Sequence, residues 1–228
     1  MNHARTSRPI PLALTMLVAF FAALTALAVS NGHDAHAHGT PAAHAGSVSP
    51  SQAALRSDMR VLWEDHITWT RLAIISLASG SPDTTATVNR LLRNQTDIGN
   101  AVKPFYGKAA GDKLTAELRQ HILIAADLVA AARAGDQAKL ADAQSRWEQN
   151  ADGIASVLNS VNPRFWKLTT MKAEMRMHLA LTTDEAVARL NGDWKADVAA
   201  YDQIHRHILH MSDLLSAGLV KQFPKRFR

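Results

Sequence analysis

The sequence predicts an all-α protein, an up-and-down bundle of the four-helix type with additional short helices. Apolar residues recur at spacings of three and four over segments of twenty or more residues, and no stretch alternates with the period of a strand. Alanine and leucine are abundant, which favours helix. Glycine and proline separate the periodic segments, as expected where helices end.

The helical bundle is expected in residues 51–223, divided by these stop signals. Ser51 is the expected first N-cap, Gly80 and Pro82 end the first helix, and Lys103-Pro104 ends a pair of short ones. A four-helix core with one more long helix and the short pair packed on it accounts for all segments. The expected helices are residues 51–79, 84–94, 96–102, 111–134, 136–161, 164–190 and 193–222.

Residues 1–30 have the pattern of a signal peptide or an N-terminal membrane anchor. Arg5 and Arg8 precede an uncharged apolar run, residues 12–29, and small residues follow at the spacing that signal peptidase cleaves. The run approaches the roughly 20 residues that span a bilayer, so a membrane tether through residues 12–29 stays open beside a cleaved signal. Either alternative predicts export of the body, to the periplasm or the cell surface. The absence of cysteine fits that compartment and excludes disulfides and thiolate metal sites.

Residues 31–50 have the composition of a flexible linker and are rich in histidine. Imidazole is a good ligand for borderline metals, so this tract could bind Cu(II), Ni(II) or Zn(II) weakly. The alternative is a polar linker without a ligand. The candidate ligands are His33, His36, His38 and His44.

The formal net charge is +5. The sequence nevertheless contains no basic stripe with interleaved aromatic residues, so we expect no nucleic-acid partner. The basic residues at the end of the chain, within residues 224–228, are expected to form a tail that is solvated or that contacts anionic lipid.

Four histidines occupy apolar stripes near the middle of four predicted helices. They are His66, His121, His178 and His205. Convergence of one ligand from each helix is what a metal or cofactor site in a bundle core requires. The ion would be Cu, Zn, Ni or Fe. The alternative is a set of buried histidines bonded to polar partners. His207, His210 and Met211 also share one helix face, a combination suited to copper or to a half-exposed surface.

Further polar residues interrupt the apolar stripes and predict a buried polar network that clamps helices or lines a ligand pocket. Asp127 interrupts a long apolar run and requires a partner, for which Arg71, Arg90 and Arg189 are candidates. Glu185 and Arg189 can pair across one turn. The expected network comprises Glu64, Asp127, Asn150, Asp152, Glu185, Arg189 and Asp202.

No phosphate-binding loop, dinucleotide fingerprint, nucleophile elbow or zinc-protease motif occurs. The paired Glu-x-x-His motifs of ferritin-like metal centres are also missing. The sequence therefore offers no catalytic motif.

The chain resembles a family of uncharacterised bacterial all-helical proteins, some of which carry the name acetylglutamate kinase. The resemblance covers roughly residues 55–220 and implies a shared helical fold and polar interior, with no established activity. The kinase name does not transfer, because the chain lacks the strands and glycine-rich loops that such a fold uses to bind phosphate. The segments that carry the resemblance are Leu62–Arg71, Asn89–Asn94, Pro104–Gly107, His121–Asp127, Trp147 with Asn150–Asp152, and His178 with Glu185.

Three functions are compatible with the sequence. The first is an exported, non-enzymatic bundle that binds a metal ion or small ligand through its interior. The second is a structural or protein-interaction module whose buried polar residues only fix helix packing. The third is a metal-dependent enzyme, for which the sequence proposes no substrate.

Overall fold

The computed structural model describes residues 48–228, and all of the regular structure in that part is helical. Five helices follow one another: α2 (Pro50–Ser79), α3 (Thr84–Ala134), α4 (Gln137–Val161), α5 (Leu168–Asn191) and α6 (Trp194–Gln222). A 3-10 turn, η2 (Pro224–Arg226), follows α6. The predicted all-α class is confirmed. The expected leader and the four linker histidines lie outside the described residues.

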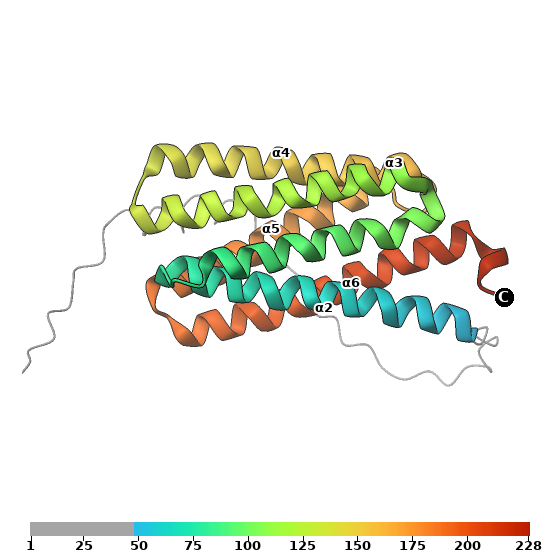
Figure 1. The fold of residues 1–228 in the computed structure, drawn as a ribbon, viewed down its shortest axis with the longest axis horizontal. Helices are drawn as coiled ribbons and strands as arrows, with labels where there is room; N and C mark the ends of the chain where they lie inside the picture. Colours follow the sequence, from blue (N-terminus) through green and yellow to red (C-terminus); the bar gives the residue numbers. More distant parts are fainter. Residues whose placement is uncertain (1–47) are drawn as a thin grey trace, which may run out of the picture.

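The helices pack into a closed ring in which each contacts the next and α6 returns to α2 (Figure 1). Short turns join them. Gly80, Gly135 and Gly192 end α2, α3 and α5 in the left-handed conformation that glycine adopts without cost. The first N-cap is Ser49 rather than Ser51, with Pro50 in the first turn.

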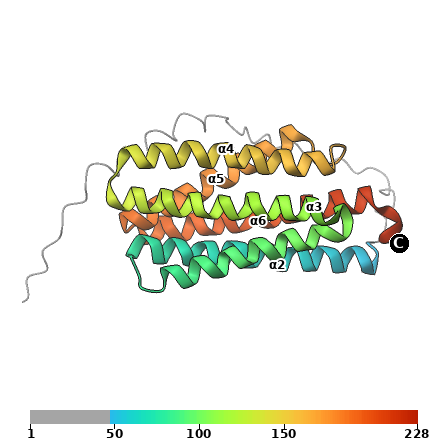
Figure 2. The same cartoon turned by 45° about the horizontal axis from the view of Figure 1, so that its top comes forward.

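Helix α3 bends back on itself, a few residues after the break that the sequence predicts at Lys103-Pro104. It runs through Pro104 and changes direction at Gly107, whose φ of 84° and ψ of 170° are non-helical. Figure 2 shows two arms that meet at this bend and spread apart away from it. The arms touch where Gly99 faces Gly111, because a Cβ on Gly99 would lie 2.8 Å from the carbonyl oxygen of Gly111. The predicted break between residues 94 and 96 does not exist.

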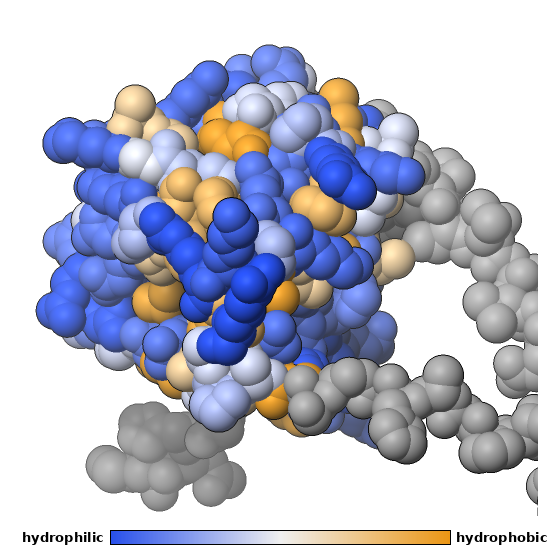
Figure 3. Space-filling view, turned by 90° about the vertical axis from the view of Figure 1, so that its right-hand side faces the viewer, coloured by the Kyte–Doolittle hydropathy of each residue, from blue (hydrophilic) through white to orange (hydrophobic). Residues whose placement is uncertain are grey.

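The main apolar core runs through the ring and includes Trp63, Ile98, Ile154 and Ile208, and two smaller buried clusters lie around Ala73 and Ile74. The end of the bundle that carries the C-terminus is covered mostly by hydrophilic side chains (Figure 3). The basic residues Lys225, Arg226 and Arg228 are exposed, whereas Phe227 among them is 6% exposed and stacks on Phe105. No helix among residues 48–228 is long and apolar enough to cross a membrane.

Candidate functional site

Three of the four predicted core histidines converge inside the bundle. His66 comes from α2, His121 from the second arm of α3 and His178 from α5, and their exposed fractions are 3%, 3% and 4%. The ring centroid of His178 lies 5.8 Å from that of His66 and 6.0 Å from that of His121. His178 is therefore adjacent to both of the other rings.

Polar partners on neighbouring helices orient two of the three imidazoles. Asn150 Oδ1 accepts from Nδ1 of His121 at 2.8 Å, while the Asn150 amide donates to Glu117. This tautomer leaves a lone pair on Nε2 of His121. Gln95 Nε2 lies 3.2 Å from Nδ1 of His66 and also bonds to a backbone carbonyl, so Nδ1 accepts and Nε2 of His66 carries the proton.

The third imidazole is not satisfied. Nδ1 of His178 is buried and has no hydrogen-bond partner among the described residues. A buried polar atom without a partner costs free energy, roughly 1–3 kcal/mol, unless a bound water or ion completes it. His178 is thus the residue of the cluster that most requires a further ligand.

All three histidines are uncharged at physiological pH. Burial lowers the pKa of His66 to about 3, with a contribution from neighbouring His121. Burial also lowers the pKa of His121 to about 4 and that of His178 well below its ordinary value. The neutral imidazole is the form that binds metal ions.

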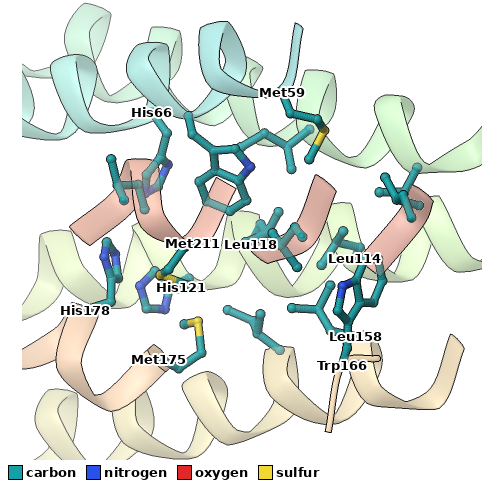
Figure 4. A pocket seen from close by; sticks show the side chains of 17 residues that line it. Met59, His66, Leu114, Leu118, His121, Leu158, Trp166, Met175, His178 and Met211 are labelled. Atoms are coloured by element: carbon teal, nitrogen blue, oxygen red, sulfur yellow. The ribbon is translucent and has the colours of Figure 1, made fainter. Parts of the chain in front are cut away.

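The cluster lines one end of an internal cavity of about 30 Å³. Met175 and Met211 line the cavity too, and Figure 4 shows their sulfur atoms at the end that holds the histidines. Leu158 and Trp166 lie at the other end (Figure 4), and no carboxylate contributes to the lining. The volume suits one ion or one or two waters, whereas organic ligands need roughly 300 Å³ or more.

A second internal cavity, of about 40 Å³, lies beside Thr70, Thr182 and Thr183. Each threonine hydroxyl donates to the carbonyl four residues earlier in its own helix. This cavity therefore presents mainly apolar groups and offers no polar ligand set.

His205, the fourth predicted core histidine, lies outside the cluster. Its side chain is 33% exposed, and its Nε2 lies 2.7 Å from Oε2 of Glu64. The expectation of a core position was wrong because the buried stripe of α6 runs through Ile204 and Ile208. His205 is one residue, about 100° of helix rotation, away from it.

Four of the predicted buried carboxylates lie at or near the surface. One of them is Glu64, whose side chain is 43% exposed and contacts His205. The side chain of Asp127 is 62% exposed and pairs with Arg146 instead of the arginines expected from the sequence. Asp152 is half-buried and pairs with Lys172, and Asp202 is exposed. These expectations failed because alanine is found on both buried and exposed helix faces. An acidic residue in an alanine-rich segment can therefore lie on the solvent face.

Glu185 and Arg189 are part of a charged clamp, although they do not pair with each other. Arg71 of α2 contacts Glu185 Oε1 at 2.8 Å and Asp197 Oδ1 at 2.9 Å, and Arg189 contacts Asp197 at 3.2 Å. The two carboxylates are 0% and 2% exposed. Burial raises the pKa of Glu185 to about 7 despite the adjacent Arg71. We call these four residues the arginine clamp.

Sequence reasoning missed several residues that shape the interior. Gln95 and Asn94 are both 0% exposed and approach α2, and they stand in an apolar stripe with Leu91 and Ile98, which was a usable signal. Asp197 was missed because an acidic residue in the first turn of a helix is ordinarily explained by the helix dipole.

Within residues 48–228, no three or more His, Asp or Glu side chains are grouped so that they could hold a metal ion between them. The arrangement can still supply two imidazoles and two thioethers from three helices to one cavity. Comparisons with protein-family models, with curated proteins and with solved structures find no match to this chain.

Proposed function

We propose that the protein is an exported helical bundle that binds one transition-metal ion in its interior, with a preference for Cu(I). The ligands would be His121, His178, Met175 and Met211. The observation that carries the proposal is the cavity of about 30 Å³ that these four side chains line at one end. His66 would join only after a change of tautomer, since its Nε2 carries the proton.

The choice of Cu(I) follows from the donors and from their charge. Thioethers are soft ligands and select Cu(I), whereas Ni, Fe and Zn favour sites with more nitrogen and oxygen. No carboxylate lines the cavity, so a bound ion keeps its full charge in an apolar surrounding. Burying a single positive charge costs much less than burying two.

Export is supported by the sequence pattern of residues 1–30, with its two arginines, apolar run and small residues. The absence of cysteine is compatible with an oxidising compartment. In a chain without cysteine, the methionine thioethers are the soft donors that remain, with imidazoles as borderline ligands beside them.

Anaerobic competition with a chromophoric Cu(I) chelator tests the proposal. The full chain would carry His33→Ala, His36→Ala, His38→Ala and His44→Ala, so that the linker contributes no sites. We expect one Cu(I) per chain, with affinity lowered about tenfold or more by Met211→Leu and by His121→Ala. The Met211→Leu change nearly conserves volume, so it preserves the fold. His205→Ala is the matched control and leaves the affinity unchanged.

The proposal fails if the folded chain retains no Cu(I), or if Met211→Leu and His121→Ala bind it as tightly as the parent. Circular dichroism of each variant shows whether the bundle is intact.

A structural module is the second candidate, favoured by a different observation. His121 and His66 already have amide partners, and no group of three His, Asp or Glu side chains among residues 48–228 can hold a metal ion. In that case the interior polar residues only fix helix packing. Loss of stability in His121→Ala without any metal uptake by the parent would support it.

A further inference from the structure

The end of the bundle that carries the C-terminus collects basic side chains. Helix α2 begins there, α3 bends there, the chain passes from α4 to α5 there, and α6 ends there (Figure 1). Hydrogen bonds join these segments. Arg226 donates to the carbonyl oxygen of Pro104, and the Asn162 amide donates to the hydroxyl of Tyr106. Segments far apart in the sequence therefore build one face, which we call the basic end.

The basic end has a large excess of positive charge. Its segments, residues 48–54, 103–113, 160–168 and 220–228, contain nine basic side chains and one acidic side chain, Asp112. Among residues 48–228, only Lys103 and Lys108 of the nine form an ion pair, in both cases with Asp112. Figure 3 looks onto this end and shows hydrophilic side chains that project outward. The nine, all exposed except the first, are Lys103, Lys108, Lys113, Arg164, Lys167, Lys221, Lys225, Arg226 and Arg228.

The opposite end of the bundle has no such excess. It is built by the turns that follow α2, α3 and α5, within residues 79–85, 132–140 and 188–197. These segments contain four basic and four acidic side chains, and some of them pair, as Lys139 does with Asp136. The positive charge is therefore concentrated at one end of the bundle and is not spread evenly over the molecule.

Aromatic rings lie beneath some of the charges of the basic end. The guanidinium of Arg226 lies 5.2 Å from the ring centre of Phe105, and that of Arg164 lies 5.1 Å from the ring centre of Phe165. Aromatic rings favour the boundary between lipid headgroups and acyl chains, and basic side chains are attracted to anionic headgroups. The basic end presents both kinds of group together.

We propose that the basic end binds an anionic phospholipid surface, so that the bundle stands on a membrane by this end. Each Lys or Arg close to such a surface strengthens binding by about fivefold, and several act together here. The described chain also enters the bundle at this end, since the Ser49 hydroxyl donates to the carbonyl of Phe227. The tether expected in residues 12–29 precedes this entry in the sequence and would hold the bundle by the same end. The proposal does not depend on the Cu(I) site.

Co-sedimentation of the full chain with vesicles tests the inference. One kind of vesicle contains phosphatidylglycerol in phosphatidylcholine, and the other contains phosphatidylcholine alone. The apolar run of residues 12–29 contributes to both, so the ratio of the two partition coefficients reports the contribution of charge. We expect a ratio of about ten or more that falls toward one in high salt, because salt screens exposed charges.

A triple charge reversal at the basic end should lower that ratio about tenfold or more. The three side chains are exposed and form no ion pair with another of residues 48–228, so the fold is kept. The variant combines Lys167→Glu, Lys221→Glu and Lys225→Glu. The matched control reverses three exposed basic residues elsewhere that also lack an ion pair among residues 48–228, and it keeps the ratio within about twofold. The control combines Arg93→Glu, Lys195→Glu and Arg206→Glu.

A second measurement reports the orientation and needs no charge variant. The chain has no cysteine, so Ser160→Cys at the basic end or Thr85→Cys at the opposite end provides a single site for a fluorophore. In anionic vesicles we expect energy transfer to a lipid-borne acceptor to be stronger from position 160 than from position 85. The difference should shrink in phosphatidylcholine vesicles.

The inference is overturned if the parent binds both kinds of vesicle equally, or if energy transfer from position 85 is as strong as from position 160. It is also overturned if the control loses as much of the ratio as the basic-end variant, because net charge alone would then be the cause. Met211→Leu separates this inference from the proposed function, since it loses Cu(I) affinity and keeps the preference for anionic vesicles.

Discussion

At the scale of single residues, the interior histidines are uncharged because the bundle removes their rings from water. Two of them have a side-chain amide as hydrogen-bond partner, and the third leaves one ring nitrogen without a partner. His121 has Asn150, His66 has Gln95, and Nδ1 of His178 has no partner among the described residues. Desolvation disfavours the imidazolium in each case. The consequence is a dependence of stability on pH that surface histidines would not produce.

We predict that acid destabilises the fold between pH 6.5 and 4. The folded pKa values of His66 (about 3) and His121 (about 4) lie below the ordinary value of 6.5, and the pKa of His178 is lowered too. The unfolded chain then binds more protons, so stability is full above pH 6.5 and is lost as the pH falls. Each histidine contributes up to about 1.4 kcal/mol per pH unit. The raised pKa of Glu185, about 7, has the opposite effect on stability, because the folded chain binds that proton more readily than the unfolded chain. The effect of one carboxyl group is smaller than that of the three histidines together.

Melting curves by circular dichroism between pH 7.5 and 4.5, in a metal chelator, measure this effect. The control His205→Ala should follow the parent, because that half-exposed ring lies outside the cluster. A melting temperature that stays constant from pH 7 to pH 5 would contradict the prediction.

Residue periodicity identified His66, His121 and His178 as interior because each is spaced three or four residues from apolar residues of its own segment. It failed for His205 because α6 carries apolar residues on two faces. Val198 is 53% exposed on one face, whereas Ile208 is 0% exposed on the other. Which face points inward depends on neighbouring helices and not on the periodicity of α6 itself.

At the scale of elements, the bend of α3 determines how the interior is built. The second arm brings His121 to the cavity, and it does so because the chain reverses at Gly107. Proline at position 104 suggested the wrong residue for the break. Helices tolerate proline near an end, whereas the backbone angles of Gly107 lie in a region that only glycine enters readily.

Gly107→Ala should therefore lower the free energy of unfolding by about 1–3 kcal/mol. Space is not the cause, since a Cβ there would meet no atom within 4 Å. Gly153→Ala in α4 is the comparison, because its only contact would be the flexible end of Glu117. In a helix interior that change is neutral or stabilises by up to about 1 kcal/mol. Urea titrations of both variants give the two values, and equal stabilities would argue against the backbone explanation.

At the scale of the whole molecule, the arginine clamp closes the ring. Arg71 on α2 holds Glu185 on α5 and Asp197 on α6, so the first described helix is tied to the last two. Ser49 adds a second tie, as its hydroxyl donates to the carbonyl of Phe227 at 2.7 Å. These contacts join segments more than one hundred residues apart.

We predict that Arg71→Ala lowers the free energy of unfolding by about 3–5 kcal/mol, because Glu185 would remain buried without a counter-charge. Adding Glu185→Gln should restore part of the loss by removing that charge. Arg56→Ala should have little effect on stability, since Arg56 is 53% exposed and its partner Asp213 keeps Arg60. Chemical denaturation of the three variants measures these values. A loss for Arg71→Ala no larger than for Arg56→Ala would mean that the clamp adds nothing.

The sequence by itself determined the helical class, most helix ends and three of the interior histidines, because periodicity, glycine and proline act locally. Only the tertiary structure decided that α3 bends at Gly107 and not at Pro104, which partners Arg71 has, and that His178 meets His121 and the two methionines. Those contacts depend on the relative rotation and register of helices distant in the chain. Local pattern does not encode that rotation, because a helix with apolar residues on two faces can bury either one.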